Sequence, residues 1–130
     1  MTKTQPTDWL FFAQSDLDGA RSLADDSIYH IACFHCQQAV EKALKVYILS
    51  TGKIPPKVHT LQELAEGVTE TLREIEQFRP QLIILDTFYI PTRYPDALPG
   101  SLPEGLPTKQ DAEEAINIAE KLLALVREHI

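Results

Sequence analysis

The sequence has no apolar run long enough to cross a lipid bilayer. A membrane-spanning helix needs about 20 consecutive apolar residues, whereas polar or charged residues interrupt every apolar stretch of this chain after a few positions. The N-terminus, MTKTQPTDW, also lacks the apolar core of a secretory signal peptide. Two cysteines in 130 residues are too few for a disulfide framework and fit a reducing compartment. We therefore predict a cytoplasmic protein that does not enter a membrane.

Glycine is scarce and scattered, which excludes the common phosphate-binding loops. The five glycines stand far apart, so neither a Walker loop nor a dinucleotide-binding fingerprint can form. No serine occupies the Gly-x-Ser-x-Gly turn of a hydrolase nucleophile. We expect no bound cofactor, and any nucleotide would have to be held by side chains.

Basic residues are outnumbered by acidic ones, 12 against 19, and the net charge of −7 argues against a general nucleic-acid binder. The exception is the segment 42–59, which holds Lys42, Lys45, Lys53 and Lys57 and no acidic residue. This segment is either a solvated helix end with its loop or a surface that faces phosphate.

The length and the apolar spacing predict one helical domain over residues 1–130. A chain with 44% hydrophobic residues can bury a single core, and no alternating strand pattern occurs. Apolar residues instead recur at steps of three and four. We predict an all-α, antiparallel up-and-down bundle of four to five helices that begins after a flexible N-terminus at residues 1–7. The expected helices run from Thr7 or Asp8 to Ala24, from Ile28 to Ser50, from Leu61 to Ile75, from Gln81 to Phe88, and from Thr108 to the C-terminus.

Capping residues mark several of these helix ends. Ser27 can cap the second helix, and Gly52 stands where a helix C-terminus favours glycine. Thr60 with Glu63 predicts a capping box. The same pattern recurs at Thr108 and Asp111.

The second predicted helix is apolar around most of its circumference. A helix of this kind contacts neighbours on more than one side, either within the bundle or across a dimer interface. Its Cys33 and Cys36 form a Cys-x-x-Cys motif with His35 between them. A redox motif belongs at a helix N-terminus, and a zinc site needs two further ligands. We therefore expect no metal, and we interpret the cysteines as small packing residues.

Prolines recur at every fourth position from Pro91 to Pro107, which excludes a helix there. Residues 91–107 thus form a long connection without regular structure, and such connections are either functional or disordered. We expect residues 97–107 to be a mobile proline-rich loop. Residues 91–96 carry Arg93, Tyr94 and Asp96, which are suited to anchored contacts: arginine binds phosphate or carboxylate with two hydrogen bonds, tyrosine stacks on a base, and the aspartate either joins the site or holds the arginine.

Four polar residues share one side of the second helix, because Gln38, Glu41, Lys42 and Lys45 are spaced by three and four. This side is either a solvent face with a Glu41–Lys45 pair or a phosphate-binding face that His35 and His59 join in space. The candidate ligand-binding residues are Arg93, Tyr94, Asp96, Lys42, Lys45, Gln38, His35 and His59.

Four segments in order resemble the HEPN family (higher eukaryotes and prokaryotes nucleotide-binding domain) over residues 8–130. They are FHCQQAVEKALKVYI, the start of the third helix at His59-Thr60-Leu61-x-x-Leu64, YIPTRYPDA, and TKQDAEEAINIAEKLL. The resemblance implies a four- or five-helix bundle that forms a homodimer. It also implies a partnership with a minimal nucleotidyltransferase, the pair behaving as a toxin–antitoxin system.

Many members of this family are metal-independent ribonucleases that carry an arginine followed four to six residues later by histidine. No histidine follows Arg93 at that spacing, so the usual general acid–base partner is missing. Two alternatives to nucleotide or RNA binding therefore stay open. One is a protein-interaction module without a nucleotide site, and the other is a divergent ribonuclease that combines Arg93 with His35 or His59.

Overall fold

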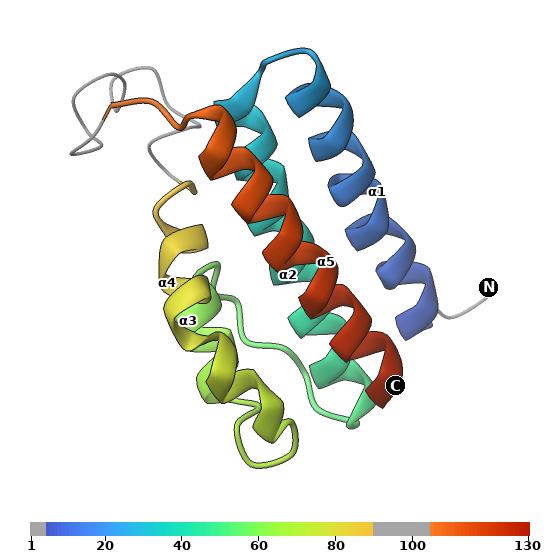
Figure 1. Ribbon diagram of the computed structural model, residues 1–130. Helices are drawn as coiled ribbons and strands as arrows, with labels where there is room; N and C mark the ends of the chain where they lie inside the picture. Colours follow the sequence, from blue (N-terminus) through green and yellow to red (C-terminus); the bar gives the residue numbers. More distant parts are fainter. Residues whose placement is uncertain (1–4, 90–104) are drawn as a thin grey trace.

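The computed structural model describes residues 5–89 and 105–130, and these residues are helical without any strand (Figure 1). The all-α prediction is confirmed. The elements are α1 (Pro6–Asp25), α2 (Tyr29–Ser50), α3 (Leu61–Glu66), the 3₁₀ helix η1 (Arg73–Phe78), α4 (Arg79–Asp86) and α5 (Lys109–His129).

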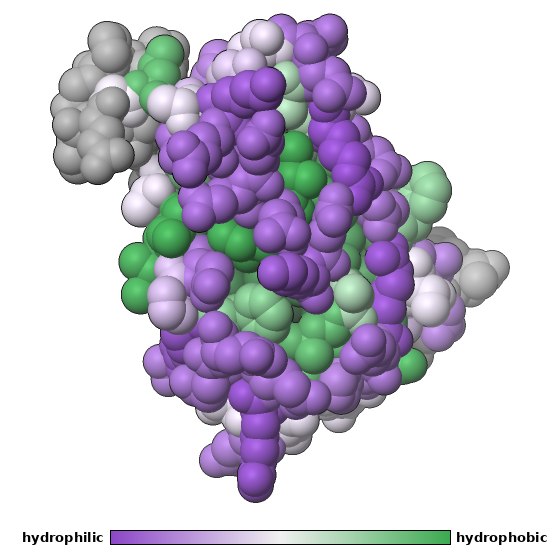
Figure 2. Space-filling view, viewed as in Figure 1, coloured by the Kyte–Doolittle hydropathy of each residue, from purple (hydrophilic) through white to green (hydrophobic). Residues whose placement is uncertain are grey.

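Three long helices lie side by side and form the bulk of the bundle (Figure 1). α1 runs antiparallel to α2 and α5. In the chain, η1 and α4 come between α2 and α5, and they run in the opposite direction to α2. The start of α1 and the end of α5 lie at the same end of the molecule. The face with α5 in front is largely hydrophilic, with apolar residues showing mainly in the seams between helices (Figure 2). None of the helices in the described parts of the chain is both long and apolar enough to span a membrane.

The first two helices begin at residues other than those predicted. α1 starts at Pro6, with Gln5 as the N-cap, because proline presets the helical φ in the first turn and Asp8 then accepts a hydrogen bond from the Gln5 N–H at 2.8 Å. Thr7 therefore lies inside the helix, and residues 1–4 lie outside the described residues. Ser27 does not cap α2, since it adopts a positive φ of 63° in the α1–α2 turn and Ile28 is the N-cap.

The third predicted helix is shorter than expected. α3 ends at Glu66, with Gly67 as its C-cap, and η1 forms only at Arg73. Glycine followed by β-branched residues in the stretch GVTET disfavours continued helix. Val68, Leu72 and Ile75 are nonetheless buried, so the predicted apolar positions are correct although their conformation is not α-helical.

A residue distant in sequence caps α3. Thr60 is the N-cap, but the predicted capping box is wrong because its hydroxyl has no hydrogen-bond partner. The Asp86 carboxylate at the end of α4 instead accepts hydrogen bonds from the backbone N–H groups of Leu61 at 2.8 Å and Gln62 at 3.2 Å. The box at Thr108 and Asp111 is confirmed: the threonine hydroxyl accepts from the Asp111 N–H, and the aspartate accepts from the Thr108 N–H.

α2 is the central helix of the bundle. It packs most extensively against α1 and α5 and also contacts α3 and α4. The apolar circumference predicted from the sequence is therefore covered largely within this one chain. Cys33 and Cys36 are fully buried free thiols inside this helix. Burial raises the pKa of Cys33 to about 12 and raises the pKa of Cys36 as well, which fits the packing role predicted for them.

Candidate functional site

One narrow strip of α2 is left uncovered by the rest of the described chain. From Ala32 to Ile48, every residue is buried except Phe34, His35, Gln38, Lys42 and Lys45. Four of these five are residues predicted for the site. The spacing of three and four residues therefore identified the accessible side of α2, except that Glu41, predicted to share it, is buried. We call these five residues the polar strip.

An acidic residue of α1 holds two residues of the strip, His35 and Lys42. Asp16 contacts His35 through Oδ1, 2.9 Å from Nδ1, and accepts a hydrogen bond from Lys42 Nζ at Oδ2 over 2.5 Å. Burial alone would raise the pKa of Asp16, but the hydrogen bonds and the charges of His35 and Lys42 outweigh it and hold this pKa below its usual value. The carboxylate thus remains ionised and positions both the His35 ring and the Lys42 ammonium group.

A second acidic residue, Glu41 of α2, holds Lys45 and the neighbouring His59. Glu41, only 6% exposed, accepts a hydrogen bond from Lys45 Nζ at 3.2 Å through Oε2, and the same oxygen lies 3.3 Å from His59 Nδ1. This observation confirms the predicted Glu41–Lys45 pair. The other carboxylate oxygen, Oε1, is buried and has no hydrogen-bond partner.

Two glutamines connect the strip to the segment before α3. The amide of Gln38 donates to Gln37 Oε1 at 2.9 Å, and the Gln37 amide donates to the backbone carbonyl of His59 at 2.9 Å. Gln37 is completely buried. Since a buried amide holds its partners firmly, the position of His59 relative to Gln38 is set by the core.

Four rings form a continuous row beside these polar groups. Ring centroids are 5.5 Å apart for His35 and Phe34, 6.1 Å for Phe34 and Tyr89, and 5.8 Å for Tyr89 and His59. The last two pairs are stacked, with interplanar angles of 24° and 14°. We call these residues the aromatic row. Arg93, Tyr94 and Asp96 lie in the segment 90–104, outside the described residues.

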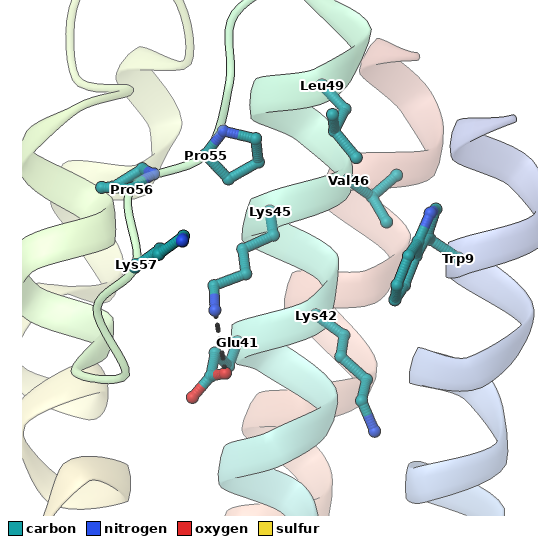
Figure 3. A pocket seen from close by; sticks show the side chains of 9 residues that line it. All are labelled: Trp9, Glu41, Lys42, Lys45, Val46, Leu49, Pro55, Pro56 and Lys57. Atoms are coloured by element: carbon teal, nitrogen blue, oxygen red, sulfur yellow. Dashed lines mark hydrogen bonds and ion pairs between the residues drawn. The ribbon is translucent and has the colours of Figure 1, made fainter. Parts of the chain in front are cut away.

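Lys42 and Lys45 also face a groove at the other end of the strip (Figure 3). The groove has a volume of about 440 Å³ and crosses α2 between α1 and the segment after α2. We call it the lysine groove; it is lined by Trp9, Glu41, Lys42, Lys45, Val46, Leu49, Pro55, Pro56 and Lys57.

The structure thus brings five predicted residues together on one side of α2, in two groups. His35, Gln38 and His59 lie near the aromatic row, whereas Lys42 and Lys45 border the lysine groove. Asp16, Tyr89 and Trp9 were not predicted as site residues. Asp16 and Trp9 lie within a predicted amphipathic helix and Tyr89 follows another, and these positions in the sequence do not indicate which residues they contact.

In the described segments, 5–89 and 105–130, no three His, Cys, Asp or Glu side chains gather as possible metal ligands. The candidate site offers imidazoles held by carboxylates, lysine ammonium groups and stacked rings.

The family model of the HEPN domain matches residues 7–129. The chain belongs to the HEPN family. The resemblance found in the sequence is thereby confirmed, and it extends over almost the whole chain.

Known proteins and solved structures agree with this assignment. The HEPN chain is 28% identical over 127 residues to the protein of Methanocaldococcus jannaschii named "Putative toxin MJ1304", with 91% of this chain and 83% of that protein covered. The crystal structure of TT1696 from Thermus thermophilus is 36% identical, with a TM-score of 0.85 and coverage of 96% and 98% of the two chains. ST0689, described as an archaeal HEPN homologue, is 34% identical with a TM-score of 0.74, and the coverage is 97% and 98%.

Proposed function

We propose that this HEPN protein is toxin-like and binds nucleotide or RNA through phosphate groups, as a homodimer that acts with a minimal nucleotidyltransferase in a toxin–antitoxin, stress or defence system. Membership of the HEPN family and the similarity to a relative named as a toxin support the first part. The homodimer and the nucleotidyltransferase partner rest on what the family resemblance implies.

The observation that carries the proposal is the position of Tyr89. This residue stacks between His59 and Phe34 and is the last residue before the segment 90–104. Arg93 follows it by four residues, a separation that an extended chain spans over at most about 14 Å. A guanidinium can bind phosphate there, and the ring of His59, whose side chain is 58% exposed, can stack on a base. The aromatic row, the polar strip and Arg93 together therefore supply the groups that a nucleotide requires.

Isothermal titration calorimetry of the full chain with ATP and with short RNAs tests this proposal. We expect heat of binding and a rise in melting temperature with at least one ligand, and a loss of affinity of at least about tenfold in Arg93→Ala. Arg73→Ala removes an exposed arginine from η1 and serves as the matched control. If neither ligand produces heat, the alternative of a pure protein-interaction module replaces nucleotide binding.

The homodimer has its own test. Two separate pairs of large apolar side chains are exposed, Phe11 and Phe12 on α1 and Ile83 and Ile84 on α4, and exposed apolar surface indicates association. Light scattering is expected to give twice the chain mass, and a monomer mass at working concentration would contradict the dimer. Co-purification with a co-expressed minimal nucleotidyltransferase tests the partner.

A specific observation also favours the second candidate, a divergent metal-independent ribonuclease. His35 and His59 each direct Nδ1 toward a carboxylate, Asp16 and Glu41 respectively. A carboxylate on Nδ1 orients the imidazole so that Nε2 can exchange a proton with a substrate. One imidazole would accept the proton of the ribose 2′-hydroxyl as it attacks the phosphorus, and the other would protonate the leaving 5′-oxygen.

This candidate predicts RNA cleavage that persists in EDTA and that His59→Ala and Arg93→Ala both abolish. The control is His30→Ala, which removes an imidazole of α2 outside the polar strip. Cleavage that continues unchanged in the Arg93 variant would dismiss the ribonuclease assignment.

A further inference from the structure

The lysine groove has an apolar lining that nucleotide binding does not use. Trp9 forms one wall, Val46 and Leu49 lie along α2, and Pro55 and Pro56 form the opposite wall (Figure 3). Trp9 is 44% exposed and Leu49 is 37% exposed, although tryptophan and leucine are usually buried. Phe12, with its ring 6.3 Å from that of Trp9, extends this apolar surface along α1. An accessible apolar surface with an aromatic wall is typical of protein interfaces.

The rim of the lysine groove is basic on a chain that is acidic overall. Lys42, Lys45 and Lys57 line it, and they belong to the segment 42–59 that has no acidic residue. Lys42 and Lys45 are paired with Asp16 and Glu41. Lys57 makes no ion pair with any residue of the described parts of the chain. The groove therefore offers positive charge beside an apolar surface.

A buried acceptor adds an independent indication of a ligand. Glu41 lines the groove, is more than nine-tenths buried, and its Oε1 has no hydrogen-bond partner. A buried carboxylate oxygen without a partner is costly by about 1–3 kcal/mol or more. A donor on a bound molecule, such as an unpaired N–H group in the first turn of a helix, would satisfy this oxygen.

Charge decides between the possible occupants. A second copy docked by a two-fold axis would place the same three lysines opposite their own counterparts, which like-charge repulsion disfavours. A free phosphate group would meet the Glu41 carboxylate beside the two paired lysines. An acidic helical peptide with apolar side chains satisfies each feature. Its carboxylates reach Lys57 and the rim, its apolar groups contact Trp9 and the prolines, and the unpaired N–H groups of its first turn are donors for Glu41.

We propose that the lysine groove is the docking site for an acidic, amphipathic segment of a partner protein, seated between Trp9 and Pro55–Pro56. The segment is a helix that places an apolar side chain in the groove and carboxylates along the lysine rim, as helix-in-groove complexes do. The lysine groove and the proposed nucleotide site share Lys42 and Lys45. The tests of this inference therefore use Trp9 and Lys57, which take no part in the proposed nucleotide site.

Fluorescence anisotropy with the full chain tests the groove. The probe is a labelled amphipathic peptide of about 14 residues with Glu at its polar positions and Leu and Trp at helical spacing. Two comparison peptides carry Lys in place of every Glu, or Ser in place of every apolar residue. We expect the acidic apolar peptide to bind at least about tenfold more tightly than either, and its affinity to fall as salt is raised.

Variants locate the peptide. Trp9→Ala is expected to weaken binding at least about tenfold, because aromatic anchors dominate interface energetics. Lys57→Glu is expected to weaken it about fivefold or more through charge reversal at the rim. The matched controls are Leu106→Ala, an exposed apolar residue outside the groove, and Lys121→Glu, an exposed lysine of α5. Circular dichroism verifies that each variant is folded.

Three outcomes would overturn the proposal. The first is equal binding of the acidic and basic peptides, and the second is unchanged affinity in both Trp9→Ala and Lys57→Glu. The third is binding of ADP or a short RNA that Trp9→Ala weakens, which would assign the groove to a nucleotide. Loss of RNA binding in Arg93→Ala with peptide binding intact would support both proposals, with Arg93 as the anchor for RNA and Trp9 and Lys57 as the anchors for the peptide.

Discussion

The two sides of α2 are held in place by different forces. On the inner side, Cys33, Cys36, Ala39 and Ala43 are completely buried, and their small side chains allow α1 and α5 to pack closely. On the polar strip, positions depend instead on pairs with Asp16 and Glu41. Close packing allows one arrangement only, whereas partly exposed ion pairs are weak enough to exchange for a ligand's charges. The inner side of α2 is thus a rigid support, whereas its polar strip is held by ion pairs that a ligand can replace.

The inner side can be probed through thiol reactivity, where we expect the largest effect. The pKa of Cys33 is raised from 9.0 to about 12, so at pH 8 its thiolate fraction is lower by about a thousandfold. Iodoacetamide is expected to leave both cysteines unlabelled in the native protein and to label both in urea. Mass spectrometry provides the measurement, and rapid labelling of the native protein would contradict close packing around α2.

The packing itself is tested by Leu44→Ala on the inner side and Leu49→Ala at the groove. Leu44 is fully buried and Leu49 is partly exposed. Truncating the buried leucine leaves a cavity and is expected to lower the free energy of unfolding by about 2–5 kcal/mol. Leu49→Ala should lower the free energy of unfolding by less than about 1 kcal/mol. Urea denaturation compares the two, and similar losses would remove the distinction between the two sides.

A third side of α2 faces the short helices α3 and α4, and Asp86 at the end of α4 caps α3. Asp86→Ala leaves the N–H groups of Leu61 and Gln62 without their acceptor. We expect a loss of about 2 kcal/mol in unfolding free energy and faster hydrogen exchange at these two amides. The control is Asp25→Ala, which removes an exposed carboxylate at the end of α1. Equal stability of the two variants would show that the Asp86 cap is unimportant.

The polar strip is expected to respond least and to depend on pH. Asp16→Asn removes a charge that binds His35 and Lys42, and we expect a loss of about 1–2 kcal/mol at pH 7. The pKa of Asp16 lies below its usual 3.8, so its contribution is present above about pH 4 and is lost as the pH falls through the folded-state value. The difference between wild type and variant should therefore shrink at pH 3. A difference that grows toward low pH would contradict the proposed pairing.

Much of the fold was predictable because it depends on neighbours along the chain. The apolar spacing located the five helical regions, and the Thr108–Asp111 box depends on residues three positions apart. The α3 region was predicted less well, since its cap is Asp86, 25 residues after Leu61. A pattern of neighbouring residues cannot predict a capping side chain that comes from another helix.

The sequence by itself determined which side of α2 is accessible, because helical geometry places residues at steps of three and four on the same side. Only the tertiary structure decided what surrounds that side. Asp16, Tyr89 and Trp9 reach it from distant segments that core packing brings alongside α2. Helix periodicity is a local property of the backbone, whereas the partners of a charged side chain depend on which helices pack together.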